Sequence, residues 1–262
     1  EDSDARIRAA SLRTLSRILN SQRLRPGSSP AEARLFRELL PPLMSRWTAF
    51  GRKAASQDQR LVDDDTYLLL EVVAEVFGEL AYSNSLYKET HFRKYAMKAF
   101  VSMATCNGPL IRRNCSFNMP GMSLVLCEKY STELCTVVDC LSKDADEEVR
   151  WILAAGFHET VRILLPNGRP DRLLSAFGSL SQDTSSKVRQ NLLNHFADTV
   201  TTLTKNGDLS AMRKLVPMLQ KLEKIDEFSW RNQQQFAEEV DKSVHIIPPQ
   251  ILLDKTLPIL YD

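Results

Sequence analysis

The stretch Leu141-Ser-Lys-Asp-Ala-Asp-Glu-Glu-Val-Arg150 returns 39 residues later, in altered form, as Leu180-Ser-Gln-Asp-Thr-Ser-Ser-Lys-Val-Arg189. The leucine, the serine, the first aspartate, the valine and the arginine all coincide at this one offset. Internal copies at a fixed spacing of roughly 20 to 50 residues are typical of proteins built from stacked repeats. The pair of stretches therefore predicts a chain in which one structural unit is repeated.

A dipeptide of an apolar residue and arginine marks further copies of this unit. From Arg112 onward the spacings between these arginines are 38, 39 and 42 residues. A second phrase, apolar residues around proline, recurs at 39–43, 215–219 and 256–260. Both patterns extend the predicted repeat over most of the chain. The dipeptides are Ile7-Arg8, Ile111-Arg112, Val149-Arg150, Val188-Arg189 and the weaker Trp230-Arg231.

Apolar residues recur at the 3.6-residue helical period after each of these dipeptides. The chain has only 9 glycines and is rich in good helix formers, so we predict an all-α fold in which each unit is an antiparallel helix pair. Pro120-Gly121 would interrupt one helix as a hinge or a tolerated kink. The predicted helices span 4–20, 32–49, 62–82, 87–105, 109–128, 131–142, 146–165, 170–181, 185–205, 208–224, 228–244 and 248–260.

Composition narrows the class of protein. The net charge of +1 gives no overall field that would attract nucleic acid or an anionic membrane, and no apolar run is long enough to span a bilayer. The five cysteines fit no zinc spacing, so we expect reduced, buried thiols in an intracellular protein. Because the chain opens and stops inside repeat-like phrases, we expect residues 1–262 to be one solenoid segment of a longer protein, with about five complete units.

These phrases resemble HEAT repeats, in which an Asp stands in the turn between two helices and a Val-Arg pair opens the second helix. Asp144 with Val149-Arg150 and Asp183 with Val188-Arg189 match that pattern, and the match covers nearly the whole chain. Within the family, the proline phrases and the segments 146–159, 228–233 and 248–258 look like the scaffold subunit of protein phosphatase 2A. They look closer still to the HEAT-repeat regulatory subunits of protein phosphatase 4.

The resemblance implies an α-solenoid scaffold, cytoplasmic or also nuclear, whose turns dock a serine/threonine phosphatase catalytic subunit of the type 2A or type 4 group and position its substrate proteins. We expect Arg150 and Arg189 to form an internal ladder with turn carboxylates and carbonyls, since a partly buried arginine is usually paired. Turn residues outside the repeat are then the better candidates for partner binding. They are Lys143, Glu147, Glu148, Thr184, Ser185 and Lys187. Trp151 is a further candidate, because it follows Arg150 directly and lies off the main apolar stripe.

No catalytic pattern stands out in the sequence. The four histidines are scattered, and His158-Glu159 has no second metal ligand at the helical spacing that a zinc site needs. We therefore predict a protein that is not an enzyme and holds no metal or cofactor. Two other functions remain open: a tubulin-binding HEAT array, which would need an uninterrupted line of basic turns, and a transport or nucleic-acid adaptor, which would need a basic concave surface.

Overall fold

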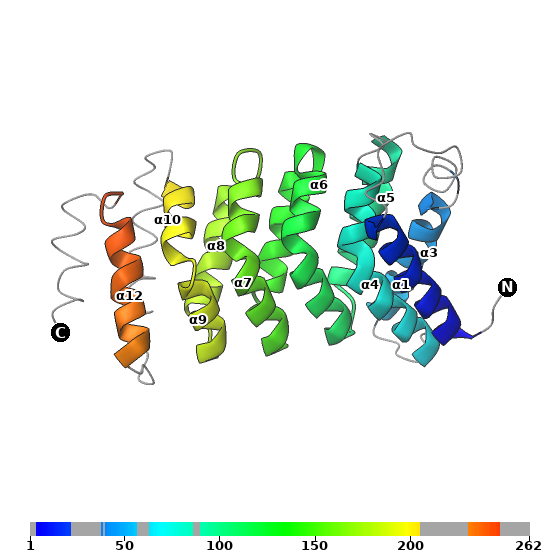
Figure 1. The fold of residues 1–262 in the computed structure, drawn as a ribbon, viewed down its shortest axis with the longest axis horizontal. Coiled ribbons are helices and arrows are strands. Elements are labelled where there is room, and N and C mark those ends of the chain that lie inside the picture. The colour runs from blue at the N-terminus through cyan, green and yellow to red at the C-terminus, as the bar shows by residue number, and fades with distance from the viewer. Residues whose placement is uncertain are drawn as a thin grey trace. The chain divides into compact units, whose positions relative to one another are not determined.

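The computed structural model describes residues 4–21, 38, 40–56, 63–85, 90–204 and 230–246. Within these ranges the chain forms ten helices and no strand, so the predicted all-α class is confirmed (Figure 1). The helices predicted at 208–224 and 248–260 lie outside the described residues. The helices are α1 (Ala5–Ser21), α3 (Leu40–Ala54), α4 (Asp64–Ser85), α5 (Thr90–Ala104), α6 (Pro109–Leu141), α7 (Glu147–Leu164), α8 (Pro170–Ser181), α9 (Ser186–Leu193), α10 (Phe196–Thr204) and α12 (Trp230–Ser243).

The chain divides into two compact units, Glu1–Tyr130 and Ser131–Asp262. Helix α6 passes from one to the other, and Tyr130 interrupts it with non-helical dihedral angles of φ −127° and ψ 22°. This residue lies in the gap that the sequence predicts between 128 and 131. Pro120, by contrast, lies inside α6 without ending it.

In the first unit, helices α1, α4 and the first part of α6 lie side by side and run parallel. The guanidinium of Arg13 bonds to Glu75 and the hydroxyl of Ser16 bonds to Glu79. Residues later in α1 thus contact residues later in α4, so the two helices run in the same direction. The amides of Asn114 and Asn118, one turn apart on α6, bond to the carbonyls of Glu71 and Ala74 in the same order.

Helices α3 and α5 form a second layer of the first unit. Gly51 of α3 lies so close to Ser102 of α5 that an added Cβ would meet the serine backbone at 2.9 Å. Between the layers, the ring of Phe77 lies 6.2 Å from Trp47 and 6.3 Å from Phe100, measured between centroids. Each such side chain stabilises the fold by roughly 1.5–3 kcal/mol on full burial.

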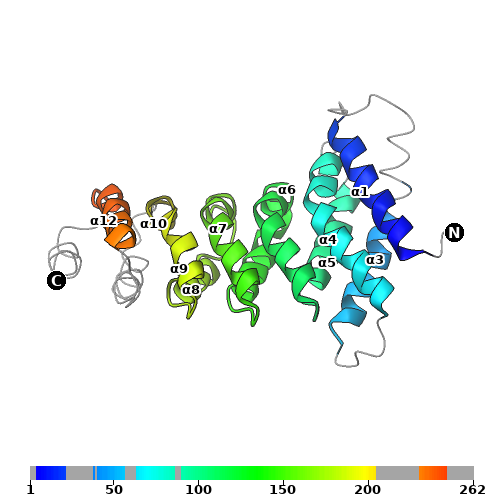
Figure 2. The ribbon, with the colours of Figure 1, turned by 60° about the horizontal axis from the view of Figure 1, so that its bottom comes forward.

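The second unit repeats this two-layer plan. The last part of α6 lies beside α8, where the Asp139 carboxylate bonds to Arg172 and the Ser131 hydroxyl bonds to the carbonyl of Asn167. In the other layer α7 contacts α9 and α10, which in turn contact α12, and Figure 2 shows α7, α9, α10 and α12 in sequence. The rings of Phe157, Phe177 and Phe196 follow one another through the core at centroid distances of 6.3 and 6.1 Å.

The prediction of one continuous helix over 185–205 is wrong, because the chain forms two helices there, α9 and α10, separated by Asn194 and His195. The break is stabilised from α12. The buried carboxylate of Glu239 accepts a hydrogen bond from the Ala197 N–H at 3.0 Å, and the amide of Gln235 donates to Asn194 at 2.8 Å. Glu239 thus satisfies a backbone donor that the interrupted helix leaves unpaired.

Candidate protein-binding site

An arginine stabilises each of the turns before α7 and α9, which contain the two repeated stretches of sequence. The guanidinium of Arg150 donates to the carbonyl of Asp144 at 2.7 Å, and that of Arg189 donates to the carbonyls of Asp183 and Thr184. Arg112 makes the same bond to the carbonyl of Cys106, also six residues earlier, at 2.8 Å. Each arginine therefore closes the turn that precedes its own helix, as the internal ladder predicts.

Arg150 also joins one turn to the next. Its Nε and Nη2 atoms bond to Asp183 Oδ2 and Oδ1 at 2.5 and 2.9 Å, and only 14% of the arginine side chain and 3% of the aspartate side chain are exposed. The hydrogen bond to Asp183 raises the pKa of Arg150, against the opposing effect of burial. Asp183 Oδ1 also accepts the Ser185 N–H at 2.9 Å. This buried pair is structural and leaves other turn residues to face a partner.

The structure brings several predicted binding residues to the surface of these turns. Glu147 is exposed and its Oε1 accepts a hydrogen bond from the Ser185 hydroxyl at 2.9 Å, which ties the α7 turn to the α9 turn. Thr184 and Lys187 are exposed, whereas Glu148 is half-buried. These residues lie at the beginnings of the neighbouring helices α7 and α9 or in the turn before α9, so a partner that contacts one turn is in reach of the next.

Trp151 is 37% exposed, and its backbone carbonyl accepts a hydrogen bond from the Asn191 side chain at 3.1 Å. Trp47 behaves differently, because it is 2% exposed and packs edge-on against Phe77 in the core. Tryptophan is enriched among residues that dominate protein interfaces. The exposed indole of Trp151 is therefore a stronger binding candidate than the sequence alone could establish.

Lys143 lies in a polar network that the sequence did not predict. Its Nζ donates to Asp139 Oδ1 at 2.6 Å and to the Ser175 hydroxyl at 3.0 Å, and Arg172 donates to Asp139 Oδ2 at 2.9 Å. Burial opposes ionisation of Asp139, but hydrogen bonds from Lys143, Ser175 and Arg172 outweigh it and lower its pKa. Lys143 is thus exposed to a partner and also stabilises the contact between α6 and α8.

The charges at the helix ends separate stabilising residues from binding candidates. Asp146 caps α7 by accepting the Val149 N–H at 3.1 Å, and Glu147 and Glu148 follow in the first turn. Acidic groups there stabilise a helix by about 0.3–1 kcal/mol each through its dipole. Lys187 stands in the first turn of α9, where a positive charge is unfavourable, and no ion pair offsets it among the described residues. Helix stability therefore does not explain this lysine.

Two histidines stack at the break between α9 and α10. The rings of His158 and His195 lie 3.8 Å apart between centroids with an interplanar angle of 16°. Burial, and then the charge of His195, lower the pKa of His158, while Glu159 and Asp198 act in the opposite direction. This pairing was not predicted from the sequence, because the two residues belong to different repeats.

The stacked pair leads to a prediction about pH. Since the pKa of His158 is lower in the folded chain than in the unfolded one, the unfolded chain gains its proton first as the pH falls below about 6.5. We therefore expect the second unit to lose stability between about pH 7 and pH 5, and His158→Gln to reduce that loss in thermal melts. His245→Gln, at an exposed position, is the control. Identical pH dependence in both variants would contradict the assignment.

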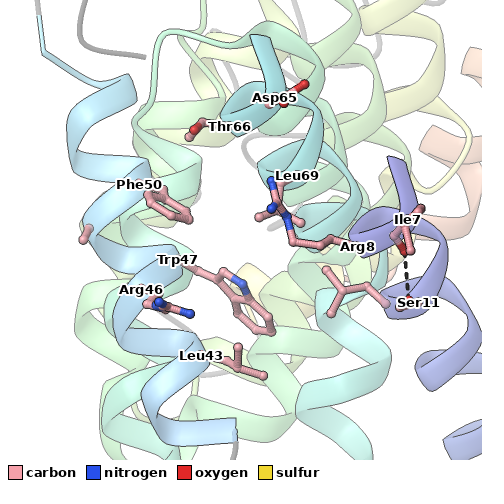
Figure 3. A pocket seen from close by; sticks show the side chains of 12 residues that line it. Ile7, Arg8, Ser11, Leu43, Arg46, Trp47, Phe50, Asp65, Thr66 and Leu69 are labelled. Carbon is pink, nitrogen blue, oxygen red and sulfur yellow. Dashed lines mark hydrogen bonds between the residues drawn. The ribbon is translucent and has the colours of Figure 1, made fainter. Parts of the chain in front are cut away.

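A pocket of about 660 Å³ opens between α1, α3 and α4 in the first unit (Figure 3). Leu43, Trp47 and Phe50 line it from α3, and Arg8 extends into it from α1. Its lining contains no histidine or cysteine, and no group of three metal-ligating side chains occurs in the described ranges.

The cysteines are free thiols, as expected, but they are not all buried. Cys106, Cys115 and Cys135 are buried, Cys127 is half-buried and Cys140 is exposed. Burial raises the pKa of Cys115 well above its usual value, and it also raises that of Cys135, which makes both thiols poor nucleophiles. The prediction of uniformly buried cysteines is wrong for Cys140, which faces outward from the end of α6.

Comparison with known proteins adds little to this geometry. No family model and no curated protein sequence matches the chain. Among the solved structures that match, the crystal structure of an engineered protein aligns over 94% of this chain and 92% of its own, with 14% identity and a TM-score of 0.49. At that level the likeness supports no argument about function. No described helix is long and apolar enough to cross a membrane.

Proposed function

We propose that this chain is a non-catalytic scaffold of HEAT type. The support for the HEAT assignment is the repeated geometry: helices α7 and α9 run parallel, and residues one repeat apart meet, as Glu147 with Ser185 and Trp151 with Asn191 do. The ion pair between Arg150 and Asp183 links two consecutive turns. Such a stack offers a long row of turns, each with different side chains, on which a protein partner can lie.

The observation that carries a binding function is the combination of Trp151 and Lys187. An exposed indole, and a lysine at a helix N-terminus that has no ion pair among the described residues, are both unfavourable for an isolated protein. A partner that packs on the indole and offers an acidic group to the lysine makes both favourable. The acidic first turn of α7 adds charges of the opposite sign. A partner surface with patterned charges fits these turns better than a uniformly charged polymer does.

The proposed partner is a serine/threonine phosphatase catalytic subunit of the type 2A or type 4 group. This choice rests on the resemblance of the repeat and proline phrases to scaffold and regulatory subunits of those phosphatases. In this reading the chain holds the catalytic subunit in the cytoplasm and positions substrate proteins, and the metal chemistry belongs to the partner. The chain itself then needs no cofactor.

Direct binding tests the proposal. Immobilised chain should bind purified type 2A or type 4 catalytic subunit in biolayer interferometry. The double substitution Trp151→Ala with Lys187→Ala should raise the dissociation constant at least tenfold, which is a loss of about 1.4 kcal/mol of binding free energy. Arg169→Ala, at an exposed position of the same unit, is the control. Charge reversal at Glu147 and Glu148 is a poorer probe because it also destabilises α7.

Two results would remove the proposal. If neither catalytic subunit binds while purified tubulin dimer does, the tubulin-binding alternative replaces the phosphatase. If a catalytic subunit binds but the double variant and Arg169→Ala behave alike, the contact lies elsewhere on the chain.

A further inference from the structure

The pocket between α1, α3 and α4 has the size and the lining of a site for a small molecule. Its volume of about 660 Å³ lies within the range of roughly 300–1,000 Å³ that is usual for ligand sites in proteins. Apolar side chains from all three helices line it: Leu12 from α1, Leu43, Trp47 and Phe50 from α3, and Leu69 from α4. The pocket is therefore large enough and apolar enough to enclose an aromatic ring system.

Trp47 places an unused hydrogen-bond donor in this apolar wall. The residue is only 2% exposed, and its ring is held edge-on against Phe77 at 6.2 Å between centroids. Figure 3 shows the indole pointing from α3 into the space between the three helices. Its N–H donates to no group within the described ranges. Because a buried donor without a partner is unfavourable, a ligand that brings an acceptor to this N–H would be stabilised.

Two arginines supply positive charge at the same pocket. Arg8 is half-buried and extends into the pocket from α1, and Arg46 is exposed and directly precedes Trp47 on α3. No ion pair with a described residue neutralises Arg46. The described lining contains one acidic side chain, that of Asp65 in the first turn of α4, so two arginines against one aspartate leave one positive charge. Guanidinium and indole groups only donate hydrogen bonds, so oxygen acceptors complement all three of these donors.

We propose that this pocket binds a small aromatic carboxylate. The ring of the ligand lies against Leu43, Phe50 and Leu69. Its carboxylate accepts hydrogen bonds from the indole N–H of Trp47 and from Arg46, and its single negative charge balances the excess positive charge of the lining. The pocket belongs to the first unit and uses none of the residues of the turns before α7 and α9, so the proposal is independent of the phosphatase proposal.

An apolar side chain of a partner protein is a poorer occupant of the pocket. It would fill the apolar part, but it would cover the indole N–H and the arginines without offering them an acceptor, which is unfavourable. An amine is a poorer occupant as well, because its positive charge would meet the excess positive charge of the lining. The donors at this pocket therefore favour an anion.

The test uses the full chain with anilinonaphthalene sulfonate, a fluorescent aromatic anion, as the reporter. We expect its fluorescence to rise to saturation with one dye bound per chain. Naphthoate and naphthamide then compete with the dye; the two have nearly the same shape, but only naphthoate is charged. At low salt we expect naphthoate to displace the dye at a concentration at least tenfold lower than naphthamide. Because exposed charges are screened by ions, the difference should shrink at high salt.

Substitutions of the two donors test the recognition of the anion. Arg46→Met should reduce the preference for naphthoate over naphthamide to less than threefold. The matched control is Arg52→Met, because Arg52 is exposed on the same helix but does not line the pocket, and it should leave the tenfold preference unchanged. Trp47→Phe keeps an aromatic ring but removes the N–H, so it should weaken displacement by naphthoate at least threefold.

A substitution that fills the pocket tests the location of the site. Ala49 is exposed and lines the pocket, so Ala49→Trp should occupy its space and abolish saturable binding of the dye. Because Ala49 and Arg46 are both exposed, their variants keep the proposal testable even if Trp47→Phe does not fold. Thermal melts show which variants are folded.

Four outcomes would overturn the proposal. Without saturable binding of the dye, the pocket does not hold an aromatic anion. Equal potency of naphthoate and naphthamide would mean that the pocket takes an uncharged apolar group. Equal effects of Arg46→Met and Arg52→Met would reduce the preference to the overall charge of the chain. Unchanged binding of the dye by Ala49→Trp would place the bound dye elsewhere. None of these outcomes bears on binding of a phosphatase at the turns.

Discussion

Val188→Asp should unfold the second unit. Val188 is completely buried in α9, which packs against α7 and α8. The change removes an apolar side chain worth roughly 1.5–3 kcal/mol and places an unpaired carboxylate in the core, at a further cost of several kcal/mol. Because a typical domain is stable by only about 5–15 kcal/mol, most of the stability of the unit should be lost.

Far-UV circular dichroism with urea denaturation measures this effect. The neighbouring substitution Lys187→Asp is the matched control, because it adds the same carboxylate at an exposed position in the first turn of α9. There a negative charge is favourable, so the control should be as stable as the original chain or slightly more stable. A native melting curve for Val188→Asp would contradict the burial of α9 and with it the repeat alignment.

Asp183→Ala should cost about 3–5 kcal/mol, as expected when one partner of a buried ion pair is removed. The substitution leaves the buried Nε and Nη2 of Arg150 without their carboxylate, and it also removes the acceptor of the Ser185 N–H. Two consecutive turns would lose their connection at once. Urea denaturation followed by circular dichroism gives the change in the free energy of unfolding.

The second unit contains its own control for this prediction. Arg169 and Asp171 form an ion pair of similar geometry, at 2.8 Å, but both side chains are about half exposed. Exposed pairs contribute roughly 0–1 kcal/mol, so Asp171→Ala should change stability little. Equal losses from Asp183→Ala and Asp171→Ala would mean that burial does not set the value of the Arg150–Asp183 pair.

The parts of this fold that local sequence specifies were predicted well. Helix α7 begins at Glu147 and α8 spans Pro170–Ser181, within a residue or two of the predicted 146–165 and 170–181. Caps and prolines mark these ends: Asp146 caps α7, and Pro170 opens α8. The pairing of Arg150 with turn groups was predictable for the same reason, because the repeat itself contains both partners.

Features that depend on a neighbouring helix were missed. Nothing local marks the break at Asn194 and His195, since neither proline nor glycine occurs there; Gln235 and Glu239 on α12 stabilise it. The network around Asp139 was missed because Arg172 and Ser175 reach it from α8. Three exposed apolar residues of α6, Leu110, Phe117 and Leu124, did have a local signal in their seven-residue spacing.

The anchoring of α6 by its asparagines has a consequence for protein engineering. Asn114 and Asn118 hold this helix against α4 through hydrogen bonds, whereas Leu110, Phe117, Gly121 and Leu124 are exposed. The outward positions can therefore be randomised in a display library while the supporting framework stays intact. The first unit is in this sense a ready scaffold for selecting binders.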